Sequence, residues 1–192
     1  RNAGKSETKG AEFELTWLPW EGMTINATLA LLDMEYEKYE SEEVITSGPN
    51  EDQVVTLDRS GENPPHAPEL TYSIGATQTF YTDLGELDLH VDYYWVDETW
   101  FQDNTVNPFE SAAVQAIQRE EQEWNSVPEY DLINANATLR TNDGHWEFSI
   151  WGKNLADEEY FTSVANFWNA FGTAMRYYGA PRTYGASVKY NW

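Results

Sequence analysis

The chain has 192 residues and a formal net charge of −22, and aromatic side chains make up 15% of it. A protein that neutralises nucleic-acid phosphates needs a basic face, so this acidity argues against a nucleic-acid partner. The absence of cysteine from these residues excludes disulfide scaffolds, thiol catalysis and cysteine-ligated zinc. Disordered acidic chains are poor in aromatic residues, so the composition predicts a folded protein.

No segment resembles a secretory signal or a membrane-spanning helix. Arg1 opens the sequence without an apolar region behind it, and the longest apolar run is Leu29–Leu32. A spanning helix needs roughly 18 apolar residues. These features are typical of a soluble protein. A transmembrane β-barrel fits them equally well, because its strands alternate polar and apolar residues.

Alternation with a period of two, the period of a β-strand, dominates the sequence. In one segment Leu87, Leu89 and Val91 alternate with Asp88 and His90. The same pattern predicts seven strands, at residues 11–17, 23–31, 69–80, 86–95, 133–140, 146–150 and 184–192. The sequence therefore indicates an all-β, antiparallel protein.

The predicted connections alternate between short and long. Three are tight turns: Pro19–Gly22, Thr82–Gly85 and Asn142–Gly144. Three are long segments: Glu40–Ala67, Gln102–Pro128 and Ala156–Pro181. Short turns thus lie at one end of the sheet and long loops at the other, as in bacterial outer-membrane barrels. A soluble β-sandwich does not require its short turns and long loops to lie at opposite ends.

The first two long loops have distinct compositions. The first carries an acidic run over residues 40–62, which we interpret as a solvated loop, with a calcium site as the alternative. The second predicts a short helix, capped by Asn107, with Pro108 in its first turn and Glu110 completing a capping box. The predicted buried side of this helix carries Ala113, Ile117 and Trp124.

Nine aromatic residues on the apolar faces fall into two rows. Near the short turns lie Trp17, Phe80, Trp146, Tyr190 and Trp192, and near the long loops lie Tyr72, Tyr93, Trp95 and Tyr184. Aromatic rings collect at both interfaces of a membrane, so two girdles of a barrel account for these rows. Seven strands cannot close a bacterial barrel, which uses an even number. We therefore expect residues 1–192 to be the C-terminal part of a longer protein.

Three segments resemble TonB-dependent outer-membrane receptors. Gly4–Glu14 is similar to a strand-opening segment of these receptors, and Gly179–Gly185 to the start of their last strand. The most specific segment, Trp151–Tyr160, contains the near-terminal motif Asn-Leu-x-Asp-x-x-Tyr. Trp192 ends the chain where these receptors more often have Phe, so a terminal aromatic is retained.

The resemblance implies an up-and-down transmembrane β-barrel of about 22 strands, closed by an N-terminal plug. The plug and the first strands are not among these residues. Such a receptor imports a scarce nutrient, commonly a ferric siderophore, across the bacterial outer membrane with energy delivered through TonB. The implied partners are outer-membrane lipid, the small-molecule metal chelate, TonB through the plug, and the barrel assembly machinery through the C-terminal strand.

The third long loop carries the candidate ligand-binding residues. Aromatic rings can pack an organic ligand and an arginine can pair with a carboxylate or a metal-bound oxyanion. The residues are Phe167, Trp168, Phe171, Arg176 and Tyr178. The alternative is that these side chains only pack the loop against its neighbours.

The sequence predicts neither an enzyme nor a resident cofactor or metal site. Asp88, His90 and Asp92 share a face only because residues alternate, and no nucleophile stands beside them. His66 and His145 lie in separate segments, without metal-ligand spacing. Two rival functions stay open: a soluble glycan-binding β-sandwich that uses exposed aromatic residues, and a passive porin-like barrel.

Overall fold

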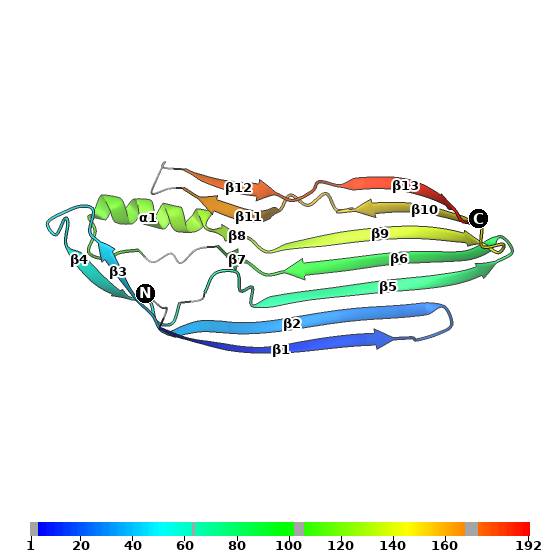
Figure 1. Ribbon diagram of the computed structural model, residues 1–192, viewed down its shortest axis with the longest axis horizontal. Coiled ribbons are helices and arrows are strands. Elements are labelled where there is room, and N and C mark those ends of the chain that lie inside the picture. The colour runs from blue at the N-terminus through cyan, green and yellow to red at the C-terminus, as the bar shows by residue number, and fades with distance from the viewer. Residues whose placement is uncertain (1–3, 63, 102–105, 168–172) are drawn as a thin grey trace.

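The computed structural model describes residues 4–62, 64–101, 106–167 and 173–192. Its main element is one antiparallel sheet of seven strands, in the order β1-β2-β5-β6-β9-β10-β13. The strands are β1 (Lys5–Trp17), β2 (Met23–Lys38), β5 (Leu70–Thr82), β6 (Gly85–Val96), β9 (Tyr130–Thr141), β10 (Trp146–Lys153) and β13 (Thr183–Tyr190). Each strand of this sheet pairs with the next one along the chain, so the seven predicted strands and the up-and-down order are confirmed (Figure 1).

Short turns and long loops lie at opposite ends of the sheet, as predicted (Figure 1). The turns between β1 and β2, β5 and β6, and β9 and β10 lie at the end where the chain terminates. At the loop end several strands run beyond their predicted limits. Strand β2, for example, continues through Asp33 to Lys38. Backbone pairing with β1 continues there although the apolar residues now lie on the other face, at Leu32, Met34 and Tyr36, because a ladder needs only backbone groups.

The long loops contain secondary structure that the periodicity did not predict. They form three small two-stranded sheets: β3 (Glu40–Val44) with β4 (Val54–Asp58), β7 (Thr99–Trp100) with β8 (Ser126–Val127), and β11 (Phe161–Asn166) with β12 (Ala174–Tyr178). The helix predicted in the second loop is confirmed as α1 (Ala112–Trp124). In the part of the chain that the structure describes, no helix has the length and apolar content needed to cross a membrane.

The prediction for the start and buried side of α1 was wrong. The N-cap is Ser111, whose hydroxyl accepts a hydrogen bond from the Val114 amide. Glu110, expected in a capping box, bonds instead to the first loop. Ile117 and Trp124 are exposed, and the buried residue of the helix is Glu121. The helix therefore uses polar contacts to hold its place among the loops, which the apolar spacing does not reveal.

Strand register gathers the apolar residues of the seven strands on one face. Phe13 lies opposite Leu29, Leu29 opposite Tyr72, and Tyr72 opposite Trp95, and the pattern continues through β9, β10 and β13. The two predicted aromatic rows form contacts across strands. Tyr72 stacks on Trp95 with ring centroids 5.4 Å apart, and Trp146 contacts Tyr190 at 4.7 Å.

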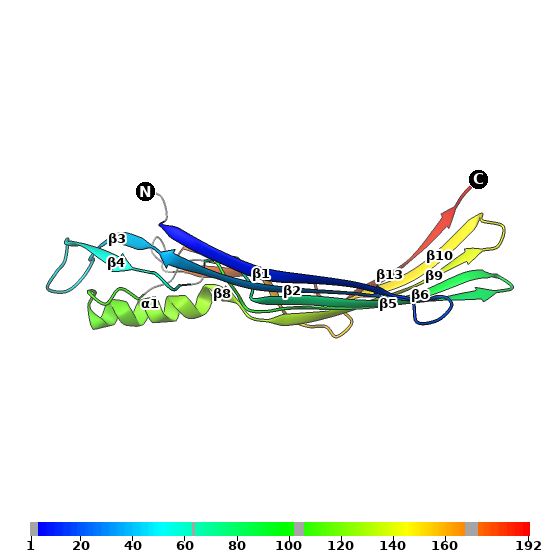
Figure 2. The same ribbon diagram turned by 90° about the horizontal axis from the view of Figure 1, so that it is seen from below.

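This apolar face is not covered by any second layer among the described residues. Figure 2 shows the sheet from its side as a single curved layer. The buried hydrophobic residues are few and lie mostly in or next to the loops: Ile45, Leu57, Val96 and Val127. A soluble β-sandwich would bury one face of the sheet against another sheet. The structure lacks that packing and has instead the form of a section of barrel wall.

The opposite face is polar and its side chains bond across strands. Thr79 donates to Asp88 at 2.6 Å, and Asn134 donates to Asp92 at 2.7 Å. Arg140 reaches three carboxylates, with its Nη1 2.5 Å from an Asp88 oxygen and its other ion pairs made to Glu86 and Glu147. A face satisfied in this way suits a water-filled or plugged interior.

Candidate ligand-binding surface

The Asn-Leu-x-Asp-x-x-Tyr motif, residues 154–160, follows β10 and begins the third loop. It also binds the residues at which this loop re-enters the sheet. Asn154 is buried and has a positive φ of 50°, a conformation that asparagine tolerates better than most residues. Its amide nitrogen donates to the carbonyls of Glu158 and Ala180 at 2.9 and 3.1 Å. Its Oδ1 accepts the Glu158 amide at 2.8 Å. Asn154 thereby joins both ends of the loop.

Two further motif residues, Asp157 and Tyr160, strengthen the same junction. Asp157 accepts hydrogen bonds from the backbone amide and the guanidinium of Arg182, at 3.0 and 3.2 Å. Tyr160 stacks on Tyr130 with ring centroids 4.5 Å apart. A Cβ at Gly179 would lie 2.0 Å from the Tyr160 ring, so only glycine fits there. The motif thus has a structural role, which is to anchor the third loop to the sheet.

The hairpin β11–β12 lies against the C-terminal end of α1. The Arg176 guanidinium lies over the rings of Trp124 and Phe161, 4.9 and 5.1 Å from their centroids. Its Nη2 donates to the Glu123 carbonyl at 2.6 Å. On the neighbouring strand, the Asn166 amide donates to Glu121 at 2.7 Å. These contacts join the second and third loops.

The first and second loops are joined through Glu110, which is buried. Its carboxylate accepts hydrogen bonds from the Thr46 amide at 2.7 Å and from the Ser47 hydroxyl at 2.6 Å. Burial acts to raise the pKa of this carboxyl, but the hydrogen bonds from Ser47 and Thr46 outweigh it, so the pKa lies below its ordinary value. Nearby, Glu43 forms an ion pair with Arg59 and accepts from the Asn107 amide at 3.2 Å.

Together these contacts make one surface from three loops, at the loop end of the sheet (Figure 1). Of the predicted ligand-binding residues, Tyr178 is 68% exposed and packs against Phe161 at 4.8 Å. Phe167 is exposed next to the end of β11, and its amide donates to the Thr173 carbonyl. Arg176 is held by α1, as described. Trp168 and Phe171 lie outside the described residues. Binding by these five residues stays a prediction.

Among the described residues, no three histidine or acidic side chains converge in a way that could hold a metal ion. His90 bonds to Thr77 at 2.8 Å, and His145 bonds to the carbonyl of Asn191 at 2.8 Å. In the acidic first loop, Asp58 accepts from the Ser60 hydroxyl and amide, and these bonds lower its pKa. Asp58 therefore has its hydrogen-bond partner within the loop.

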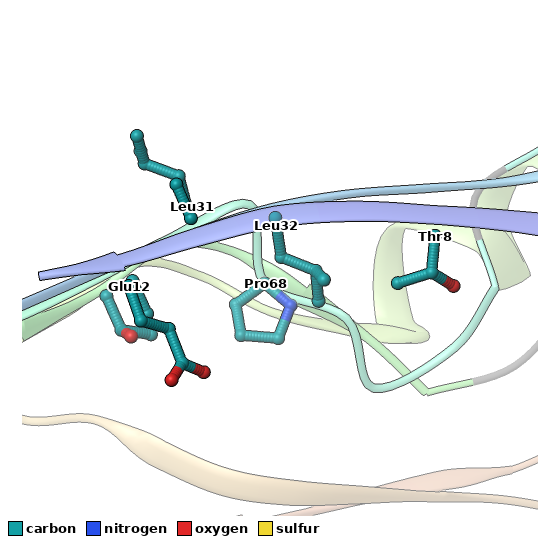
Figure 3. Close-up of a pocket in the computed structure, with 9 residues that line it drawn as sticks. Thr8, Glu12, Leu31, Leu32 and Pro68 are labelled. Carbon is teal, nitrogen blue, oxygen red and sulfur yellow. The ribbon is translucent and has the colours of Figure 1, made fainter.

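The polar face also contains a hollow of about 520 Å³ below the first loop. Figure 3 shows Thr8, Glu12, Leu32 and Pro68 on one side of β1, with Leu31 on the other. The hollow therefore opens toward the polar side of the sheet. Sequence reasoning missed it because its wall combines strand residues with Pro68 from a loop.

The protein is a single curved sheet with one continuous apolar face. Short turns join its strands at one end and long loops at the other, as in the wall of a membrane β-barrel. The family described as TonB dependent receptor-like, beta-barrel matches residues 1–155. The chain belongs to this family.

Solved receptors share the fold. The ferric yersiniabactin uptake receptor FyuA from Yersinia pestis is 15% identical with a TM-score of 0.70, and the match covers 100% of this chain and 24% of that one. BauA, the ferric preacinetobactin receptor from Acinetobacter baumannii, is 22% identical with a TM-score of 0.62, covering 96% and 22%. FpvA of P. aeruginosa, solved with iron and a heterologous pyoverdine, is 19% identical with a TM-score of 0.61, covering 96% and 19%.

The chain spans about a quarter or less of the length of these receptors. At such identities the likeness concerns the fold alone. No curated protein matches the chain.

Proposed function

We propose that this chain forms part of the barrel wall and three outer loops of a receptor that imports ferric siderophores across the bacterial outer membrane. Family membership supports a TonB-dependent receptor. The observation that carries the membrane placement is the uncovered apolar face between two aromatic rows, with Ile150 and Val188 both 63% exposed. Such a face is suited to contact the hydrocarbon tails of membrane lipids.

The proposed partners follow from this placement. Membrane lipid contacts the apolar face, and TonB delivers energy through a plug outside these residues. The barrel assembly machinery is the proposed partner of the last strand, β13. A ferric siderophore as cargo is supported by the similar receptors for ferric yersiniabactin and ferric preacinetobactin. The three-loop surface, with Phe167, Trp168, Phe171, Arg176 and Tyr178, is the proposed first contact.

The rival functions have less support. A glycan-binding sandwich needs a second sheet over the apolar face, and the described residues contain none. A passive porin does not explain the match to the receptor family.

The proposal is tested with the full-length receptor in a strain that lacks its own copy. The receptor should fractionate with the outer membrane, and it should restore uptake of radioactive iron from a ferric siderophore only when TonB is present. Recovery in the aqueous fraction would contradict the membrane placement. Uptake that continues without TonB would support the porin instead.

The loop assignment is tested by removing an exposed ring. Replacing Tyr178→Ala should weaken binding of the ferric siderophore to whole cells by about tenfold, because exposed aromatic residues are common binding anchors. The matched control is Tyr81→Ala, which removes a ring that is 71% exposed at the turn end of the sheet. Equal affinity of the two variants would count against the loop surface.

A further inference from the structure

The hairpin β11–β12 has an open edge on strand β12. Among the described residues, β12 (Ala174–Tyr178) pairs only with β11. Strand β13 is in the same position, since its partner in the described residues is β10 alone. Figure 1 shows β12 and β13 following one another along the same border of the structure. The two open edges therefore form one border, interrupted by the short link at residues 179–182.

Backbone hydrogen bonds show which groups of β12 face this border. The Phe167 amide donates to the Thr173 carbonyl at 3.0 Å, and the Gly179 amide donates to the Tyr160 carbonyl at 2.8 Å. Successive residues of an antiparallel strand direct their backbone groups to opposite sides, so residues 173, 175, 177 and 179 face β11. The irregularity of this ladder lies on β11, so the alternation along β12 is unbroken. The intervening residues direct their N–H and C=O groups to the open edge: Ala174, Arg176 and Tyr178.

The sequence of β12 favours pairing at this edge. Proteins discourage unwanted pairing with lysine, proline or a bulge on the open strand. β12 reads Ala-Met-Arg-Tyr-Tyr, without lysine or proline, and the bulge is on β11. The Arg176 side chain lies over the rings of Trp124 and Phe161. On the other face, Met175 and Tyr177 are 47% and 52% exposed, where the side chains of an added strand would flank them.

The link between β12 and β13 is held against the sheet. Asn154 donates to the Ala180 carbonyl at 3.1 Å, and Asp157 accepts from the Arg182 amide at 3.0 Å. Gly179 lies against the Tyr160 ring. These contacts keep β12 in line with β13, so a strand that pairs with β13 is directed toward β12.

The direction of such a strand follows from the architecture. A closed barrel leaves no free edge in the membrane, so β13 pairs with a strand beyond the seven of this sheet, here named the closing strand. Neighbouring strands of an up-and-down barrel are antiparallel, and β13 runs from the loop end to the turn end (Figure 1). The closing strand therefore runs toward the loop end and arrives beside β12.

Pairing at the other border of the sheet already extends beyond the apolar face. The last apolar pair of β1 and β2 on that face is Ala11 with Leu31, yet the ladder continues to Lys5 and Lys38. Ladders of this sheet therefore do not end where the contact with lipid ends.

We propose that the closing strand of the same receptor continues past the loop end and pairs with the open edge of β12. This inference rests on the membrane barrel proposed above. The backbone of the closing strand bonds to Arg176 and Tyr178, and its side chains flank Met175 and Tyr177. The third loop is thereby attached to an outer loop that lies outside the seven-stranded sheet, and the ladder that closes the barrel extends into the outer loops.

The test is hydrogen exchange, resolved to single amides, in the full-length receptor in phospholipid vesicles. The amides of Arg176 and Tyr178 should exchange at least about 100-fold more slowly than unpaired amides, because exchange then requires opening of a ladder. The amides of Met175 and Tyr177, which face β11, are the internal control and should be protected in any case. Exchange near the intrinsic rate at Arg176 and Tyr178, with Met175 and Tyr177 protected, would overturn the proposal.

A variant of the receptor identifies the partner. The closing strand is cut back at the loop end and joined to its neighbour by a tight turn. Exchange at Arg176 and Tyr178 should then rise about 100-fold, while Met175 and Tyr177 stay protected. A cut of the same length in another outer loop is the matched control and should change neither pair. Protection of Arg176 and Tyr178 that survives the first cut would mean that another segment covers the edge, and it would also overturn the proposal.

These outcomes are separate from the proposed uptake. A receptor that fractionates with the outer membrane but exchanges rapidly at Arg176 and Tyr178 refutes the pairing alone. Recovery of the receptor in the aqueous fraction refutes the barrel, and the pairing with it.

Discussion

A charge placed on the apolar face tests what that face contacts. Val91 is 46% exposed and lies opposite Ala76, which is midway between Tyr72 and Phe80. The strand between these two aromatic residues spans about 27 Å at roughly 3.4 Å per residue. With a strand tilt of about 40° the aromatic rows lie about 21 Å apart along the membrane normal, so Val91 lies near the midplane.

Substituting Val91→Arg should lower the free energy of unfolding by about 2–4 kcal/mol if lipid covers this face. On a solvent-exposed surface the same change would cost within about 0.5 kcal/mol. The measurement is urea unfolding of the full-length receptor in phospholipid vesicles, followed by tryptophan fluorescence.

The control places an arginine on the opposite face of the same strand. His90→Arg removes the hydrogen bond to Thr77 and should cost about 1 kcal/mol. Losses of equal size in Val91→Arg and His90→Arg, or a loss below about 0.5 kcal/mol for Val91→Arg, would refute a lipid-facing assignment.

Three further predictions concern contacts that only the folded chain reveals. Because the pKa of Glu110 is lowered in the folded state, this carboxylate stabilises the first loop fully above the ordinary carboxyl range, and the stabilisation is lost as the pH falls through the lowered pKa. The Thr46 amide, which donates to Glu110, should therefore exchange its hydrogen faster in acid, after correction for the intrinsic rate. Glu110→Gln should cause the same loss of protection at neutral pH. Gly185→Ala should lower the free energy of unfolding, measured in urea, by about 1–3 kcal/mol, because the new Cβ meets the Trp151 ring. In a Trp151→Ala background the same change should cost much less, and additive losses would exclude contact between the two residues. Arg176→Lys removes the planar stacking on Trp124 and Phe161, which is worth about 0.5–1 kcal/mol. The rate of amide hydrogen exchange in hairpin β11–β12 should therefore rise a few-fold. An unchanged rate would mean that the arginine does not stabilise the hairpin.

The sequence determined the seven strands, their order and the face that each residue occupies. Alternation is a local property: successive side chains of a strand point to opposite faces whatever lies around it. Short turns such as Asn142–Gly144 fixed which strands are neighbours. The aromatic rows followed from these two facts, because the tight turn at Thr82–Gly85 sets a register that places Tyr72 opposite Trp95.

The contacts between the loops could not be predicted from the sequence. The spacing around Asn107 suggested a helix cap, yet Glu110 bonds to Thr46, which is 64 residues away in sequence. Ligand binding by Arg176 stays a prediction, but its position over the Trp124 ring and its hydrogen bond to the Glu123 carbonyl could not be predicted from the sequence. Contacts of this kind depend on where each loop leaves the sheet, which no local pattern encodes.

The same division applies to the interior wall. The sequence places Trp151 on a polar face, but only the register between β10 and β13 puts Gly185 under its ring. Periodicity decides which side of the sheet a residue occupies, because that depends on its own strand alone. Tertiary structure decides which residues meet, because that depends on strands and loops far apart in the chain.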